Sequence, residues 1–209
     1  MNPYASWLSS GDNAWQMTAA TLVGLMSIPG LAVLYGGIVQ RKWAVNTMMM
    51  VFSAFALTLI VWVLWAFKMG FGTPLISTFV GDPRPVLGHA AEQGQANIPL
   101  LNGLMPNFRF PESSLVYFQF VFAAITPILF IGSVIGRISF KVWLIFVPLW
   151  ITFAYAVNAF LLWGGGCSTP TVTRSRAATT TTPPTWRTVT VTRWNWSPPR
   201  PWPADRTAG

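Results

Sequence analysis

The sequence predicts an all-α integral membrane protein with four transmembrane helices and a disordered C-terminal tail. Of its 209 residues, 53% are hydrophobic and only 9% are charged, whereas soluble domains carry about 25% charged residues. The apolar residues also fall in charge-free runs, and about 20 helical residues suffice to cross the hydrocarbon core. These observations exclude an ordinary soluble enzyme, a collagen-like chain and a coiled coil.

Each apolar run has the length of a membrane-spanning helix. We expect transmembrane helices at residues 13–38, 43–68, 113–136 and 142–163. A long outer loop, residues 69–112, joins the second helix to the third. The first run does not resemble a signal peptide, because no basic residue precedes Arg41. Pro29, Pro127 and Pro148 should interrupt the first, third and fourth helices, because proline removes a backbone hydrogen bond.

Two further features concern helix ends and helix packing. Asp12 or Asn13 suits the N-cap of the first helix, where a side-chain oxygen accepts a backbone N–H. Gly132 and Gly136 lie four residues apart in the third helix. This spacing permits the close approach of another helix, although small residues are common in membrane helices.

Basic residues in the short connections predict the orientation of the chain. Arg41 and Lys42 lie in the first connection, and Arg137 and Lys141 lie in the third. Because basic loops stay in the cytoplasm, the N-terminus and the long loop are expected outside. Lys68 is a contrary charge at the outer end of the second helix, but its long side chain can reach the interface.

The tail, residues 167–209, differs in composition from the rest of the chain. Of its 43 residues, 12 are Thr, 7 Pro, 6 Arg and 4 Trp. The prolines and the runs of threonine leave no helical or strand periodicity in the tail, so we expect it to be disordered. GC-rich codons read in the wrong frame produce these residue types, and we therefore expect a frameshift or a retained intron starting near Gly166. The alternative is an Arg/Trp arm that binds nucleic acid or lipid, although no nucleic-acid partner is expected.

The single Cys167 excludes an internal disulfide, and the single His89 excludes a two-histidine metal site within this chain. His89 is expected to be a solvated residue of the outer loop. The sequence has no acid–base pair, nucleophile triad or phosphate loop. We therefore expect no enzyme activity, no cofactor and no metal.

Several motifs occur in a familiar order. The stretch GDNAWQMTAATLVGLMSIPGLAVLYGGIVQRKWAVNTM at residues 11–48 opens with an Asp and Ala pair, carries Pro-Gly midway and ends in Tyr-Gly-Gly before a basic turn. FQFVFAAITPILFIGSVIGR follows at residues 118–137, and LWGGG ends the fourth run at residues 162–166. Residues 11–166 thereby resemble the first four helices of the ammonium transporter family (Amt/MEP/Rh). The resemblance stops at Cys167, where the family's Asp-containing motif before a fifth helix is missing.

The resemblance implies an eleven-helix fold with a pore in each subunit and assembly as trimers. It places Trp163 and Phe118 at an outer ammonium-binding site, and it makes Phe122 one of two stacked rings that close the pore. The glycine turn, Gly164, Gly165 and Gly166, would shape the region beside that site. From position alone, Trp163 could instead be an interface anchor, the phenylalanines a packing stripe and the glycines a helix end.

The functional expectation is ammonium transport across the plasma membrane, without ATP. The family's pore histidines come from its fifth and tenth helices, so we expect residues 1–166 to be a partial transporter domain that is inactive alone. The alternative is a non-transporting tetraspan subunit or regulator that associates with full-length relatives. The expected partners are ammonium or ammonia as substrate, the lipid bilayer, and either a homotrimer or full-length relatives.

Overall fold

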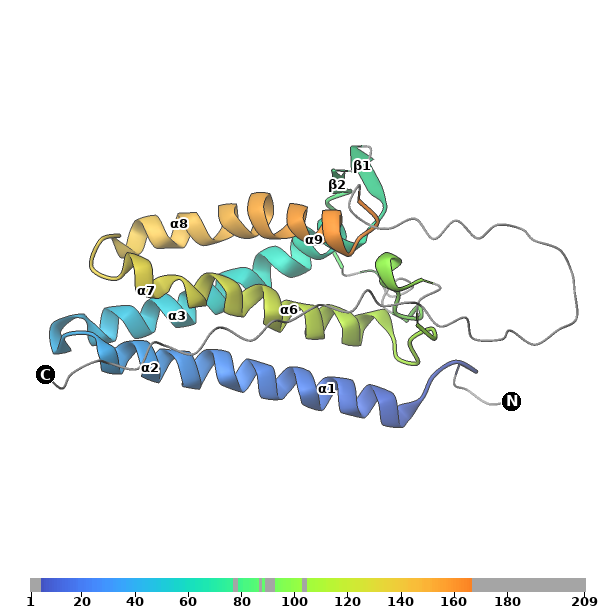
Figure 1. The fold of residues 1–209 in the computed structure, drawn as a ribbon, viewed down its shortest axis with the longest axis horizontal. Coiled ribbons are helices and arrows are strands. Elements are labelled where there is room, and N and C mark those ends of the chain that lie inside the picture. The colour runs from blue at the N-terminus through green and yellow to red at the C-terminus, as the bar shows by residue number, and fades with distance from the viewer. Residues whose placement is uncertain (1–4, 77–78, 87, 89–92, 103–104, 167–209) are drawn as a thin grey trace, which may run out of the picture. The chain divides into compact units, whose positions relative to one another are not determined.

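The computed structural model describes residues 5–76, 79–86, 88, 93–102 and 105–166, which all belong to one compact unit. In this part of the chain, four helices are long and apolar enough to cross a membrane (Figure 1). They span Ser10–Ile38, Arg41–Phe71, Glu112–Val134 and Phe140–Leu162. The predicted helices are confirmed, with bounds that differ by at most three residues from those expected. The predicted tail and His89 lie outside the described residues.

The first helix begins earlier than expected. Its segments are α1 (Ser10–Leu25), the π-helical turn η1 (Met26–Gly30) and α2 (Leu31–Ile38). Ser9 is the N-cap, because its hydroxyl accepts a hydrogen bond from the backbone N–H of Asp12 at 3.3 Å. The expectation that Asp12 or Asn13 caps this helix is therefore wrong. Asp12 lies in the first turn, where the helix dipole favours a negative charge.

Prolines interrupt three of the helices, as expected. The third helix consists of α6 (Glu112–Leu129) and α7 (Ile131–Val134), and the fourth of α8 (Phe140–Trp150), the π-helical turn η4 (Ile151–Ala156) and α9 (Val157–Leu162). Pro29 lies inside η1, and Pro148 lies three residues before η4. Pro127 lies near the end of α6, which breaks at Phe130. Proline lacks the N–H for the regular helical bond, and a local change of helix type accommodates the loss.

The second helix contains a π-helical turn that no proline predicts. Its segments are α3 (Arg41–Val61), η2 (Trp62–Ala66) and α4 (Phe67–Phe71). Trp62 in η2 is fully buried, and its indole N–H donates to the carbonyl of Val116 in α6 at 3.1 Å. A buried indole requires such an acceptor. This bond therefore links the second helix to the third.

Helix α3 lies at the centre of the bundle, where it packs against α2, α6 and α8. Trp143 of α8 is fully buried and donates its indole N–H to the carbonyl of Met50 in α3 at 2.9 Å. In contrast, α1 buries only Ala20 among its residues and exposes large apolar side chains such as Trp15. An exposed apolar face is what a helix presents to lipid or to another apolar helix.

The predicted close approach of two helices occurs at one of the two glycines. A Cβ atom on Gly132 would lie 3.3 Å from Cε1 of Tyr35, so the tyrosine ring of α2 packs directly on this position. A Cβ atom on Gly136 would meet nothing within 4 Å, and this residue adopts a φ of +73°. Gly136 therefore serves the turn before α8, where its left-handed backbone suits glycine.

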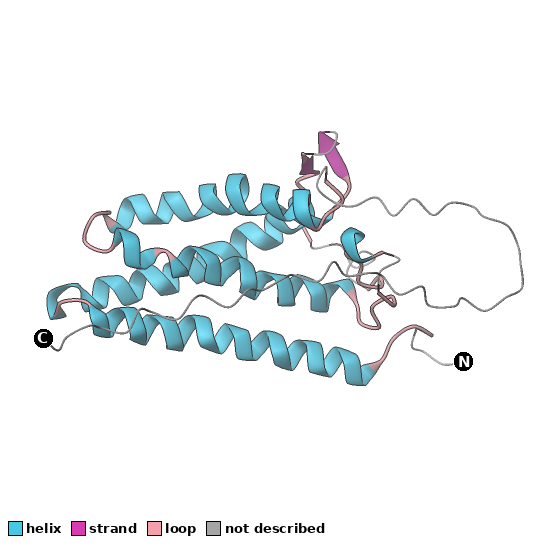
Figure 2. Cartoon of the chain, in the orientation of Figure 1, coloured by secondary structure: helices cyan, strands magenta, loops and turns pink. Residues whose placement is uncertain are grey.

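The long loop, residues 69–112, carries short elements that sequence periodicity did not predict. Strands β1 (Pro74–Ile76) and β2 (Val80–Gly81) pair antiparallel, and η3 (Pro99–Leu101) is a turn of 3₁₀ helix. Figure 2 shows these strands beside the end of the helical bundle. The connections α2–α3 and α7–α8 lie together at the opposite end (Figure 1). The elements thus define an end with a long loop and an end with short basic turns.

Candidate functional site

Phe118 and Phe122 lie on one face of α6, as their spacing predicts. Their ring centroids are 5.0 Å apart, and the ring planes are inclined at 59°. Phe118 is half-buried, whereas 38% of Phe122 is exposed. The two rings therefore form a continuous aromatic surface that is partly open to a ligand or to another segment.

Trp163 lies at the C-terminal end of α9. Its backbone N–H continues the helix by donating to the carbonyl of Ala159 at 2.8 Å, while 43% of the residue is exposed. Trp163 borders a cavity of about 150 Å³. The other lining residues come from the second, third and fourth helices and are Phe71, Gln119, Tyr155, Asn158, Ala159 and Leu162.

The third helix contributes Gln119 to this cavity rather than Phe118 or Phe122. The structure thus brings Phe118 together with Phe122, and Trp163 together with Gln119. A carboxamide within a membrane-spanning segment needs polar partners that lipid does not offer, and Gln119 accordingly lies in the cavity wall.

Sequence reasoning missed Tyr155 and Asn158. They lie three residues apart on the fourth helix, so both project from one side of it. In the sequence they could have been noticed as a tyrosine and an asparagine within an otherwise apolar run. Tyr155 also packs its ring against Trp62, with centroids 5.9 Å apart. The cavity therefore combines aromatic faces with two carboxamides.

The glycine turn holds the end of the fourth helix against the second helix. A Cβ atom on Gly164 would overlap the carbonyl oxygen of Gly70, so the position has no room for a side chain. Gly165 adopts a φ of +92°, a left-handed conformation that favours glycine. The N–H of Gly166 donates to the carbonyl of Phe160 at 2.9 Å. The turn thereby ends the helix at Trp163, which borders the same cavity as Phe71.

The long loop, residues 69–112, packs against the same turn. The backbone N–H of Leu100 donates to the carbonyl of Trp163 at 3.2 Å. A Cβ atom on Gly165 would lie 3.5 Å from Cβ of Pro99, so η3 is in contact with the glycine turn. The loop thus contributes to the placement of Trp163.

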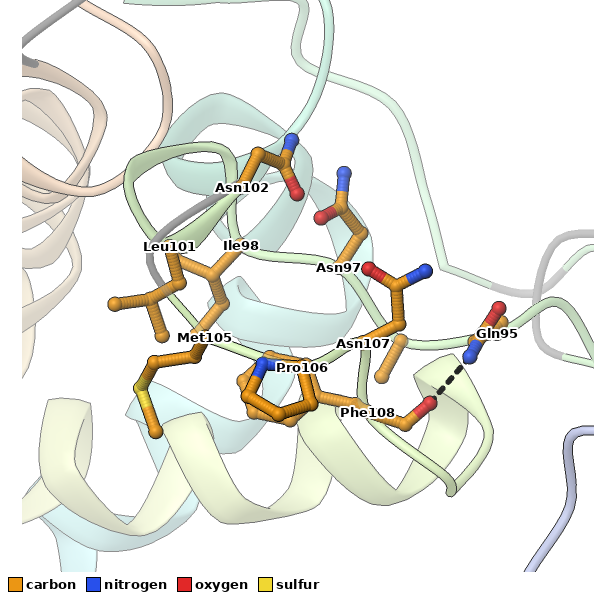
Figure 3. Close-up of a pocket in the computed structure, with 10 residues that line it drawn as sticks. Gln95, Asn97, Ile98, Leu101, Asn102, Met105, Pro106, Asn107 and Phe108 are labelled. Carbon is orange, nitrogen blue, oxygen red and sulfur yellow. Dashed lines mark hydrogen bonds between the residues drawn. The ribbon is translucent and has the colours of Figure 1, made fainter. Parts of the chain in front are cut away.

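A second cavity of about 240 Å³ lies within the loop itself (Figure 3). Its polar lining consists of carboxamide side chains, those of Gln95, Asn97, Asn102 and Asn107. Figure 3 shows Leu101 and Met105 on the other side of the hollow. Gln95 donates from Nε2 to the carbonyl of Phe108, a bond that links two parts of the loop.

Hydrogen bonds and an ion pair tie the N-terminus of α6 to its neighbours. Lys68 and Glu112 form an ion pair in which each side chain is 21% exposed. Lys68 was expected to be a contrary charge at the membrane interface; in the structure its charge is compensated by Glu112. The hydroxyl of Ser114 donates to Oδ1 of Asn13 in α1. Asp12, the neighbouring residue, is exposed and serves the first turn of α1.

The site contains no cluster of metal-ligand type. Among the described residues, no three His, Cys, Asp or Glu side chains are grouped so as to hold a metal ion. The cavity of Trp163 instead offers aromatic faces and neutral carboxamide and phenol oxygen atoms, groups that can attract a small cation.

Residues 14–175 match the model of the Ammonium Transporter Family. Ammonium transporter 2 of Arabidopsis thaliana is 54% identical over 160 residues, which cover 77% of this chain and 33% of that protein. Ammonium transporter 3 member 2 of Oryza sativa subsp. japonica is 52% identical over 171 residues, covering 78% of this chain and 36% of that protein. The chain therefore spans about a third of the length of the curated relatives that it matches.

The fold is also similar to a solved structure. The crystal structure of Candida albicans Mep2 superimposes with a TM-score of 0.58 and 28% sequence identity. The match covers 76% of this chain and 32% of the Mep2 chain. Sequence and fold agree, and the family model covers most of the chain. The chain therefore belongs to the ammonium transporter family.

Proposed function

We propose that this chain forms the outer mouth and the first four helices of an ammonium pathway across a membrane, and that it acts as a transporter component rather than an enzyme. The observation that carries the proposal is the set of partly exposed aromatic rings, Phe118 and Phe122 on α6 and Trp163 at the end of α9. Membership of the ammonium transporter family supports it, as do the names of the relatives.

The aromatic rings would recruit the cation. Ammonium loses part of its hydration shell when it leaves water, and the electron-rich face of an aromatic ring replaces some of that attraction. A cation–π contact is worth up to about 2 kcal/mol when desolvated. In this proposal, Trp163 and Phe118 supply the recruiting faces. Phe122 lies one helical turn further along α6 and gates the path beyond.

The 209-residue chain is expected not to conduct by itself. It spans about a third of its relatives, and four helices do not enclose a pore that both halves of an inverted repeat build. The test is growth on low ammonium of cells that lack ammonium uptake. We expect no growth with this chain. A chimera in which residues 1–166 replace the matching part of the Arabidopsis relative should restore it.

These two results separate the parts of the proposal. Growth with the 209-residue chain would overturn its inactivity, while a chimera that reaches the membrane but does not transport would contradict the role of residues 1–166. The control is the surface expression of both proteins, because a protein that does not reach the membrane cannot restore growth.

We further propose that the N-terminus lies outside the cell membrane and the short basic turns inside. Arg41, Lys42, Arg137 and Lys141 at one end of the bundle support this orientation. After Cys167 is replaced by serine, a membrane-impermeant maleimide should label Gly11→Cys in intact cells but not Lys141→Cys. Labelling of the second variant alone would reverse the orientation.

A second candidate is a non-transporting subunit that assembles with itself as a trimer or with full-length relatives. The favouring observation is that α1 and α8 expose large apolar side chains, among them Trp15, Leu22, Ile145 and Leu149. Such faces meet either lipid or another helix. Co-expression with a full-length relative tests this: co-purification and reduced uptake support the subunit, and independent behaviour of the two proteins contradicts it.

A further inference from the structure

A shallow groove, open along most of its surface, lies at the basic end of the bundle, distant from the aromatic site. It has a volume of about 420 Å³ and lies between the starts of α3 and α8. Its lining residues are Lys42, Val45, Asn46, Met49 and Phe140. We propose that this groove binds an anionic phospholipid, with the phosphate headgroup at Lys42 and an acyl chain along Val45 and Met49.

The charge distribution favours an anion here. Arg41 and Lys42 begin α3, Lys141 lies in the first turn of α8, and Arg137 lies in the turn before α8. All four basic residues therefore belong to this end of the bundle (Figure 1). Among the described residues, the acidic side chains belong to α1, the β2 region and the start of α6, and they are Asp12, Asp82 and Glu112. These elements begin or lie at the opposite end of the bundle (Figure 1). The ion pairs Lys68–Glu112 and Arg84–Asp82 are therefore also at that opposite end.

Two helix N-termini add to the positive potential. Helix α3 starts at Arg41 and α8 at Phe140, so their first backbone N–H groups and the positive ends of their dipoles lie at this end. The N-cap of α3, Gln40, makes no side-chain cap hydrogen bond. A phosphate group near Lys42 would thus meet a cationic side chain together with the start of a helix.

The arrangement along α3 matches the amphipathic profile of a lipid. Lys42, Val45, Asn46 and Met49 are spaced by three and four residues, so they lie on one helix face. Lys42 is at the end of the bundle, while Val45 and Met49 follow toward its middle and are 72% and 51% exposed. The face is therefore cationic at the headgroup level and apolar below. A free phosphate ion has no acyl chain to contact the apolar part.

A neighbouring tryptophan marks the level of the interface. The Nζ atom of Lys42 lies 5.6 Å from the centroid of the Trp43 ring, and Trp43 is 42% exposed. Exposed tryptophan is typical of the boundary between headgroups and acyl chains. The proposal rests on the orientation proposed above, because anionic lipids are concentrated in the cytoplasmic leaflet.

The test is lipid binding to the purified 209-residue chain in detergent, measured by native mass spectrometry. Phosphatidylglycerol and phosphatidylcholine with identical acyl chains are compared. We expect tighter binding of phosphatidylglycerol, and a loss of about fivefold in its affinity in Lys42→Gln, since a basic residue near the headgroups contributes on this scale. The matched control is Arg84→Gln, which removes the same charge from the other end.

Further arms address the acyl chain and free anions. Val45→Trp fills the apolar part of the groove and should weaken phosphatidylglycerol binding while all charges remain. Excess inorganic phosphate should not displace the lipid. Equal binding of the two lipids, equal effects of Lys42→Gln and Arg84→Gln, or displacement by inorganic phosphate would each overturn the proposal. Circular dichroism checks that each variant keeps its helices. If Lys42→Gln does not fold, the effect of Val45→Trp on phosphatidylglycerol binding tests the proposal.

Discussion

The hydroxyl group of Tyr35 donates a hydrogen bond of 2.7 Å to the carbonyl oxygen of Leu129. Leu129 is the last residue of α6, just before the helix breaks at Phe130. At this break the N–H of Ser133 donates to the carbonyl of Phe130, three residues back, and not to the carbonyl of Leu129, four residues back. The carbonyl at the break therefore takes its partner from the first helix. Such a partner matters in a membrane, because the hydrocarbon offers none.

We predict that Tyr35→Phe destabilises the bundle by about 1 kcal/mol, the usual net worth of one hydrogen bond. The measurement is unfolding in mixed micelles with increasing denaturing detergent. Tyr117→Phe is the matched control, because its hydroxyl group has an exposed, longer contact of 3.3 Å with Thr21. Equal effects of the two substitutions would contradict a special role for the Tyr35 bond.

The glycine turn supplies a second prediction. Gly164→Ala places a methyl group where it would overlap the carbonyl oxygen of Gly70, so the fourth and second helices must separate. We expect a loss of about 1–3 kcal/mol in the free energy of unfolding, the range for overpacking. Gly37→Ala is the control, because nothing lies within 4 Å of its Cβ position. Thermal unfolding of both variants decides whether the close contact is responsible.

The ion pair of Lys68 and Glu112 supplies a third prediction. Lys68→Gln leaves a mostly buried carboxylate without its cation, which should cost about 1–3 kcal/mol of stability. Exchanging the charges, Lys68→Glu with Glu112→Lys, should recover part of this loss. Recovery is incomplete because a lysine at the first position of α6 opposes the helix dipole. A double variant no more stable than Lys68→Gln would show that the pair does not act through charge.

The proposed recruitment of ammonium yields a fourth prediction. In the chimera with the longer relative, Trp163→Leu should raise the half-saturating ammonium concentration by up to about thirtyfold, which corresponds to a lost cation–π contact of about 2 kcal/mol. Trp15→Leu, at a tryptophan that is 72% exposed on α1, should leave it unchanged. Uptake of labelled methylammonium against concentration measures both. An unchanged value in Trp163→Leu would remove this residue from the binding site.

The helices and their approximate bounds follow from the sequence, because spanning length and apolar composition are local properties of a segment. The interruption at Pro29 and the pairing of Phe118 with Phe122 follow for the same reason, since both depend only on spacing along one helix. The π-helical turn at η2 does not. It contains no proline, and its buried Trp62 donates to Val116, a partner 54 residues away in the chain.

The sequence by itself determined the membrane class of this protein, its four helices and the presence of aromatic residues in the third and fourth of them. Only the tertiary structure decided which groups meet: Glu112 as the partner of Lys68, and Gln119 rather than Phe118 in the cavity of Trp163. The physical reason is that periodicity specifies one face of one helix. Which faces meet depends on the rotation and packing of several helices, which bring together residues distant in the chain.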